Sequence, residues 1–162
     1  MKKNAVSDSG PLIALAMSAH LSLLRCLFGK ILIPMEVLEE LRLDTGLPGA
    51  SLLAKAIYQD KWLVVSMLSL AKDSVSDILD SGERAAIALA VREKAVLIID
   101  EKRGRSLALS AGVKVTGAAG ILVAAKRKKL IARVTPVLSV MEDSGYYFSD
   151  RLKAKVLALA GE

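Results

Sequence analysis

Acidic residues occupy several places in the sequence where they could act on a phosphate ester. Asp8 follows the short segment 4–7, and Asp100 follows the continuously apolar segment 95–99. Glu83 stands near the start of a segment with helical spacing. Carboxylates gathered at one point raise one another's pKa, and a divalent cation relieves that repulsion. Mg²⁺ and Mn²⁺ prefer such oxygen ligands and can assist hydrolysis of a phosphodiester bond.

Two further acidic pairs leave alternatives open. Either Glu39 or Glu40 lies on the helix expected after the second strand, and Asp100 is followed directly by Glu101. Each acid also has a structural interpretation, as a helix N-cap, as a partner of a helix dipole or as a solvated surface group. Such roles explain acids one at a time, but they do not explain why two strands both end in Asp.

Cations and a hydroxyl group stand beside these acids. Lys102, Arg103 and Arg105 either bind phosphate oxygens or pair with nearby carboxylates. Ser9 either orients Asp8 or a metal-bound water, or it caps a helix. The aromatic cluster 146–148 is either a stacking face for bases or a packing anchor for the last helix.

The elements that must position these residues alternate between strand and helix. Apolar runs predict strands at residues 4–8, 30–34, 61–67, 95–100 and 113–117, with helical patterns between them. This alternation is typical of βαβ units and predicts an α/β fold with a mainly parallel sheet. The carboxyl ends of parallel strands share one edge, so Asp8 and Asp100 are expected to be neighbours.

Composition limits the classes of function. The 162 residues fit one domain, 1–162, with C-terminal helices from about residue 134. One histidine and one cysteine exclude a histidine-rich zinc site and an intrachain disulfide. The net charge of +6 favours an anionic partner such as nucleic acid. Apolar runs are too short to span a membrane and no signal peptide is evident, so a cytoplasmic location is expected.

Five segments occur in the order seen in PIN-domain proteins: VSDSGPLIAL, IPMEVLEEL, DSGERAAIALA, VLIIDEKRGRSLA and VKVTGAAGIL. The chain resembles most a prokaryotic branch of predicted nucleic-acid-binding proteins close to the VapC-type toxins. This resemblance implies a three-layer α/β/α sandwich with a mainly parallel central sheet. It also implies a ribonuclease that uses Mg²⁺ or Mn²⁺, pairing with an antitoxin protein and formation of a homodimer.

The resemblance also implies roles for particular residues. The catalytic acids would be Asp8, Glu39, Glu83 and Asp100, with Glu40 as the alternative to Glu39. The metal ligands would be Asp8, Glu83, Asp100 and Glu101. Ser9, Lys102, Arg103, Arg105 and Thr116 would contact substrate. Relatives often carry Asp where this chain has Glu101, and a bulkier pair within the segment VTGAAG.

Three functions follow from these patterns. The leading hypothesis is a metal-dependent endoribonuclease acting on RNA, as the toxin of a type II toxin–antitoxin pair or in another role. The second is a PIN-like nucleic-acid-binding module with weak catalysis, which Glu101 and the altered VTGAAG segment motivate. The third, a phosphoacceptor receiver domain, is disfavoured because Lys114 is its nearest candidate lysine and no strand in the middle of the chain ends in a lone Asp.

Overall fold

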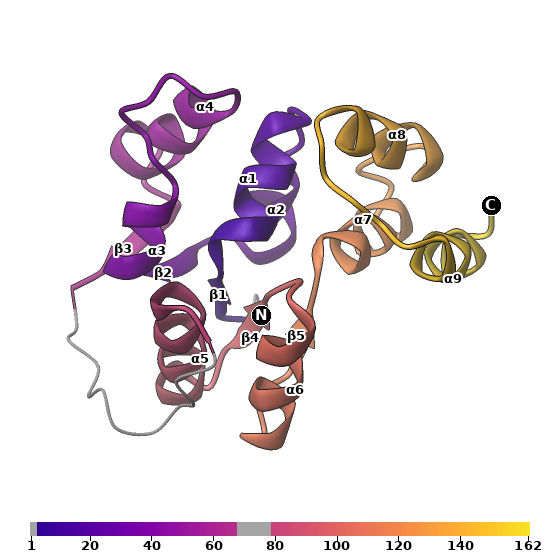
Figure 1. Ribbon diagram of the computed structural model, residues 1–162. Helices are drawn as coiled ribbons and strands as arrows, with labels where there is room; N and C mark the ends of the chain where they lie inside the picture. The colour runs from indigo at the N-terminus through magenta and orange to yellow at the C-terminus, as the bar shows by residue number, and fades with distance from the viewer. Residues whose placement is uncertain (1–2, 68–78) are drawn as a thin grey trace.

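The computed structural model describes residues 3–67 and 79–162, and its centre is a parallel sheet (Figure 1). The strands are β1 (Ala5–Ser7), β2 (Ile31–Pro34), β3 (Leu63–Ser66), β4 (Val96–Ile98) and β5 (Val115–Thr116). They pair in the order β3-β2-β1-β4-β5, and every pairing is parallel. The predicted strands and the predicted parallel sheet are therefore confirmed.

The direction in which the chain adds strands to the sheet reverses between β1 and β4. From β1 the chain proceeds outward through β2 and β3, and it then returns to β4 and β5 on the other side of β1. Ser7 is in register with Ile98, and the backbone amide of Asp8 donates to the carbonyl of Ile98 at 2.9 Å. Open α/β folds bind ligands at the carboxyl edge beside such a switch point. Asp8 and Asp100 both lie at this place, just after the ends of β1 and β4.

Helices cover both faces of the sheet, as an α/β/α sandwich requires (Figure 1). They are α1 (Ser9–Met17), α2 (Ser22–Phe28), α3 (Met35–Glu40), α4 (Ala50–Ala54), the π-helical turn η1 (Lys55–Gln59), α5 (Ser81–Glu93), α6 (Lys102–Ser110), α7 (Ala118–Arg127), α8 (Thr135–Asp143) and α9 (Asp150–Ala160). Helix α5 packs on β1, β2 and β4 and contacts α6, whereas α7 contacts α1 and α2. Right-handed crossovers account for this division, because the chain moves in opposite directions on the two sides of β1.

The core is aliphatic, as the low aromatic content predicts. The side chains of Val6, Leu97 and Ile98 are fully buried, which suits a sheet covered on both faces. The helix expected after Pro34 is shorter than its apolar pattern, because α3 ends at Glu40. The mixed polar segment 70–82 predicts a helix and a loop, and its residues 70–78 lie outside the described residues. Within the described ranges, no helix is both long and apolar enough to cross a bilayer.

Candidate active site

Asp8 is a buried carboxylate at the carboxyl end of β1. Its side chain is 6% exposed, and Oδ1 has no hydrogen-bond partner among the described residues. Asp8 holds the N-cap position of α1, but its side chain makes no capping hydrogen bond. The cap interpretation therefore does not account for this acid. Burial raises the pKa of Asp8 to about 7, the Ser9 amide opposes that change, and the charges of neighbouring acids add to it.

Glu40, rather than Glu39, faces Asp8. The hydroxyl group of Ser9 donates to Glu40 Oε2 at 2.6 Å, and the Gly82 amide donates to Oε1 at 3.1 Å. Glu39 is exposed to solvent. Consecutive helical residues point about 100° apart, so only one of the two can face the sheet edge. This placement corrects the choice of Glu39 and favours the alternative, and Ser9 orients Glu40 rather than capping a helix.

The start of α5 brings two more acids to the same place. Asp80 is the N-cap of α5, and its Oδ1 accepts the Glu83 amide at 2.8 Å. Glu83 is 8% exposed, and its pKa is raised first by burial and then by the charges of Asp80 and Glu101. The sequence interpretation missed Asp80. Its signal was available, because an Asp three residues before a Glu at a helix start is a typical N-cap.

Gly82 allows this approach between α3 and α5. A Cβ atom at Gly82 would overlap the carboxylate of Glu40. The absence of a side chain at this position lets the backbone amide reach that carboxylate, and so it fixes where Glu40 lies.

Asp100 and Glu101 have different surroundings, although they are neighbours in sequence. Asp100 Oδ1 accepts the Ala118 amide at 2.9 Å, and Oδ2 accepts a short hydrogen bond from the hydroxyl group of Tyr146. Burial raises the pKa of Asp100 despite these bonds and the nearby charge of Arg105. Glu101 is the N-cap of α6 and accepts the Gly104 amide at 2.8 Å. The cap role considered for Asp100 thus belongs to Glu101.

Tyr146 enters the site from the segment between α8 and α9. Its pKa is raised by burial and by the charge of Asp100, with a smaller contribution from Asp8. Of the aromatic cluster 146–148, Phe148 is a packing residue: it is 2% exposed and lies edge-on to Tyr146, with ring centroids 5.0 Å apart. Tyr147 is 84% exposed. The three aromatic residues therefore have three different environments.

The residues expected to bind substrate also differ in their environments. Lys102 and Arg103 are exposed in the first turn of α6, next to the acids. Arg105 is half-buried, and its Nη1 donates to the Ile99 carbonyl at 3.0 Å, so it holds the end of β4 in place. The hydroxyl oxygen of Thr116 packs against the first turn of α7, where it would overlap a Cβ at Gly120.

Comparison with known proteins identifies the family. A family model described as a PIN domain, DUF3368, matches residues 4–162. The chain belongs to the PIN-domain family. The PIN domain is a nuclease-type fold, so the predicted family and fold class are confirmed.

Curated proteins and solved structures add little to this. No curated protein matches this PIN domain. Among solved structures, it is similar to a PilT N-terminus domain protein, SSO1118, from the hyperthermophilic archaeon Sulfolobus solfataricus P2. The two share 15% sequence identity with a TM-score of 0.49, over 90% of this chain and 97% of the other.

The donor set of this PIN domain suits a hard divalent cation. The acids at the sheet edge supply only oxygen ligands, and the buried Oδ1 of Asp8 has no described partner. In residues 3–67 and 79–162, however, no three acidic, histidine or cysteine side chains converge closely enough to hold a metal ion. Both oxygens of Asp100 already accept hydrogen bonds. Asp8, Glu40 and Glu83 interact electrostatically, but their carboxylates would have to move closer together to hold one ion.

Proposed function

We propose that this PIN domain is a metal-dependent endoribonuclease that uses Mg²⁺ or Mn²⁺. The observation that carries the proposal is the buried Asp8 carboxylate, whose Oδ1 has no described hydrogen-bond partner and whose pKa is raised to about 7 beside Glu40 and Glu83. A protein gains no stability from such an arrangement without a cation, because buried carboxylates repel one another. A site of this kind is therefore typical of function rather than of structure.

The residues around the site would have different roles in cleavage. A bound divalent ion would neutralise charge on the phosphate and activate water. Asp8, Glu40 and Glu83 would hold the ion, and Ser9 keeps the Glu40 carboxylate turned toward Asp8. Lys102 and Arg103 project from the start of α6, where their cations would bind the phosphates flanking the cleaved bond.

The pair Glu39 and Glu40 provides a sharp test. Purified wild-type protein, Glu40→Gln and Glu39→Gln would be incubated with single-stranded RNA and Mn²⁺, with a chelator control. We expect Glu40→Gln to lose cleavage by about a hundredfold or more, as removal of a charge-stabilising group usually does. Glu39→Gln should cleave like wild type, because its side chain is exposed. Equal cleavage by both variants, or cleavage in chelator, would contradict the proposal.

A second candidate function is an RNA-binding module with weak catalysis. The specific observation that favours it is that both carboxylate oxygens of Asp100 accept hydrogen bonds, from Ala118 and Tyr146. Asp100 is an expected metal ligand, and these bonds occupy the oxygens that would bind the ion. RNA retention in a gel shift without metal-dependent cleavage would support this candidate. Loss of cleavage in Asp8→Asn would exclude it.

The partners expected from the family remain proposals. We propose that the chain pairs with an antitoxin and forms a homodimer, as VapC-type relatives do. A small reading frame next to the gene that encodes a DNA-binding protein would support the toxin assignment. Light scattering of the purified chain would decide the oligomeric state.

A further inference from the structure

The edge of the sheet opposite the acids carries a row of lysines. Each of the five strands is preceded, one or two residues before its first residue, by one lysine. In the spatial order of the strands these are Lys61, Lys30, Lys3, Lys94 and Lys114. All five side chains are exposed. We call this set the lysine row.

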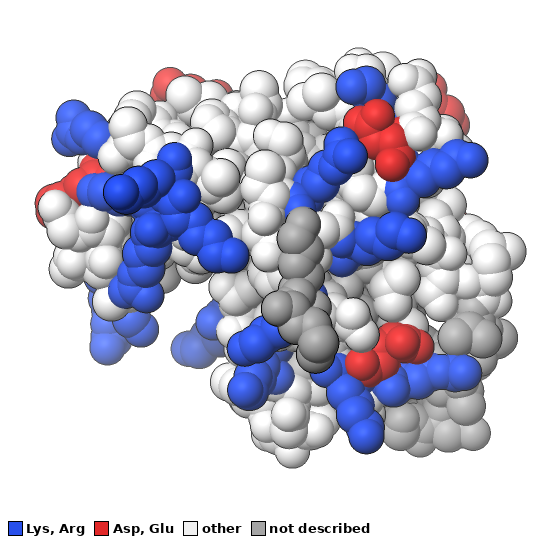
Figure 2. Space-filling model, turned by 180° about the vertical axis from the view of Figure 1, so that it is seen from behind, with Lys and Arg blue, Asp and Glu red and all other residues white. Residues whose placement is uncertain are grey.

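Backbone pairing brings the lysine row into one line. The ladder continues beyond the strands: Ile31 donates to the Trp62 carbonyl at 2.9 Å, and Leu97 donates to the Lys114 carbonyl at 2.8 Å. Neighbouring strands lie about 4.8 Å apart, so five of them set out a row about 19 Å long. Figure 2, which shows the molecule from behind, has many Lys and Arg side chains and few acidic ones.

The charge of the lysine row is not neutralised by neighbouring side chains. No member forms an ion pair within residues 3–67 and 79–162. The acids beside the row have other partners: Asp60 pairs with Lys55 at 3.6 Å, and Glu93 pairs with Arg92 at 3.9 Å. These exposed pairs leave the ammonium groups of the row available for a ligand.

Helix dipoles account for only part of this charge. Four helical segments end just before strands, and each helix end contributes roughly half a negative charge. Five ammonium groups therefore leave a surplus of about three positive charges along the edge. A structural role at helix ends also does not explain a lysine before β1, which no described helix precedes.

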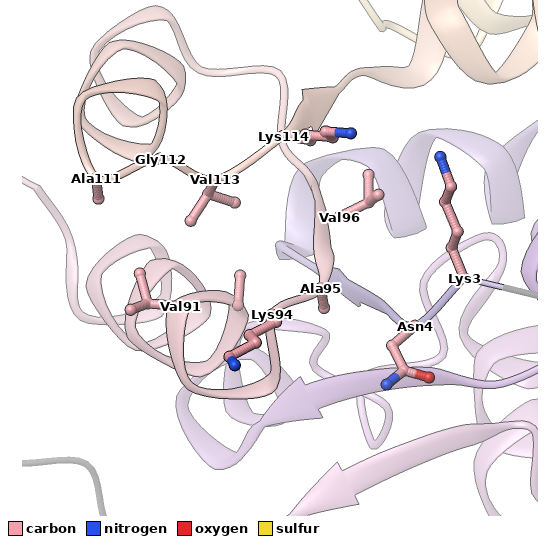
Figure 3. A pocket seen from close by; sticks show the side chains of 11 residues that line it. Lys3, Asn4, Val91, Lys94, Ala95, Val96, Ala111, Gly112, Val113 and Lys114 are labelled. Carbon is pink, nitrogen blue, oxygen red and sulfur yellow. The ribbon is translucent and has the colours of Figure 1, made fainter.

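A hollow of about 710 Å³ opens within the lysine row, between the starts of β4 and β5 (Figure 3). Lys3, Lys94 and Lys114 line it together with Asn4, and each lysine comes from a different segment (Figure 3). The rest of the lining is small and apolar, and it includes Val96. The volume lies in the range that nucleotide-sized ligands occupy.

We propose that the lysine row and its hollow form a second RNA-binding surface, at the end of the sheet opposite Asp8, Glu40 and Glu83. The ammonium groups bind phosphates of a single strand, and the apolar hollow receives a base. This surface holds RNA without cutting it, so it raises the affinity for long substrates over short ones. The choice of RNA as the ligand rests on the proposed function.

The test measures RNA binding separately from cleavage. The probe is a fluorescein-labelled 20-nucleotide single-stranded RNA, followed by anisotropy in chelator with Asp8→Asn as the parent. One variant combines Lys3→Gln, Lys94→Gln and Lys114→Gln. The matched control removes the same charge elsewhere through Lys128→Gln, Arg151→Gln and Lys155→Gln, all exposed residues at or after the end of α7. Circular dichroism melts check that both variants are folded.

We expect the lysine-row variant to bind the RNA roughly ten- to a hundredfold more weakly at about 0.1 M salt. The slope of log affinity against log salt should fall by about 2, since each lost phosphate contact removes about 0.7. The affinity of the control variant for the RNA should change little.

An equal loss of affinity in both variants would overturn the inference, because only net charge would then matter. Displacement of RNA by polyglutamate at equal charge concentration would also overturn it, because the surface would then suit acidic protein.

The two proposals can fail separately. If the wild type cleaves RNA but the lysine-row variant binds like the control, this inference fails and the nuclease assignment stands. If the wild type cleaves nothing but binding depends on the row, the nuclease assignment fails and the surface stands.

Discussion

The burial of the Asp8 carboxylate has an electrostatic cost, and that cost depends on pH. The pKa of Asp8 is about 7 in the folded protein against an ordinary value of 3.8. Between these values the folded state binds more protons than the unfolded state, so stability falls as pH rises and stays low above pH 7. A shift of this size corresponds to at most about 4 kcal/mol.

The substitution Asp8→Asn should therefore stabilise the protein at pH 8 by roughly 1–3 kcal/mol and have little effect near pH 4. Urea unfolding at both values measures this difference. Asp44→Asn is the control, because Asp44 is exposed. If Asp8→Asn were destabilising at pH 8, the carboxylate would be making a favourable contact beyond its hydrogen bond from the Ser9 amide.

In the proposed metal site, the hydrogen bond from Tyr146 competes with a metal ion for Asp100. The Tyr146 hydroxyl group occupies Oδ2 of Asp100, and a metal ion must displace it to use that oxygen. A hydrogen bond to a charged group contributes about 1.5–3 kcal/mol. We expect Tyr146→Phe to bind Mn²⁺ roughly tenfold more tightly at pH 8, as measured by calorimetry.

Tyr147→Phe provides the matched control for this prediction. Tyr147 is the next residue but is 84% exposed, so its hydroxyl should not affect the ion. Weaker Mn²⁺ binding in Tyr146→Phe would mean that the tyrosine holds Asp100 in a ligating position instead of occupying it.

At the scale of elements, the site depends on the close approach of α3 and α5. Gly82 and Gly10 are both second residues of helices, in the segments Asp80-Ser81-Gly82 and Asp8-Ser9-Gly10. A Cβ at Gly82 would overlap the Glu40 carboxylate, whereas nothing lies within 4 Å of one at Gly10.

Gly82→Ala should therefore displace Glu40 and reduce cleavage about tenfold or more, since small misplacements of catalytic groups are costly. Gly10→Ala should leave the geometry unchanged and stabilise the helix by about 0.5–1 kcal/mol. Cleavage assays and thermal melts of both variants check this. Wild-type cleavage in Gly82→Ala would show that cleavage does not depend on the position of the Glu40 carboxylate.

The same tripeptide shows why the sequence predicted the fold better than the site. Asp-Ser-Gly occurs three times. In the first copy the side chain of Asp8 makes no cap, in the second Asp80 caps α5, and in the third Gly145 ends α8 with a positive φ of 94°. Local sequence cannot distinguish these roles, because tertiary neighbours decide them. The strands were predictable because their apolar runs reflect burial on both faces, which the sequence records directly.

Choosing between neighbouring residues failed for the same reason. The sequence placed an acid on α3 but could not give the helix phase, which selects Glu40 over Glu39. It put Asp100 and Glu101 together at one strand end, and only the packing of α7 and of the 146–148 segment separates them. Tyr146 lies 46 residues from Asp100, so no local pattern could have connected them.

At the scale of the whole molecule, the two ends of the sheet differ in the charged side chains that they carry. Acids gather at the carboxyl edge and the lysine row lies along the other, so the net charge of +6 is unevenly distributed. The acidic edge stores repulsion that a divalent ion would remove. Metal binding should therefore increase the stability of the protein, because an ion that binds only the folded state stabilises it by mass action.

We expect Mn²⁺ at about a hundred times its Kd to raise the free energy of unfolding by about 2.7 kcal/mol at pH 8. For a chain of this size the melting temperature should rise by several degrees. The increase should be much smaller at pH 5, where Asp8 is protonated, and absent in Asp8→Asn. Melts with NaCl at matched ionic strength separate this effect from screening. An equal rise with NaCl, or an undiminished rise in Asp8→Asn, would place the ion elsewhere, because the response would then not depend on the buried carboxylate at the end of β1.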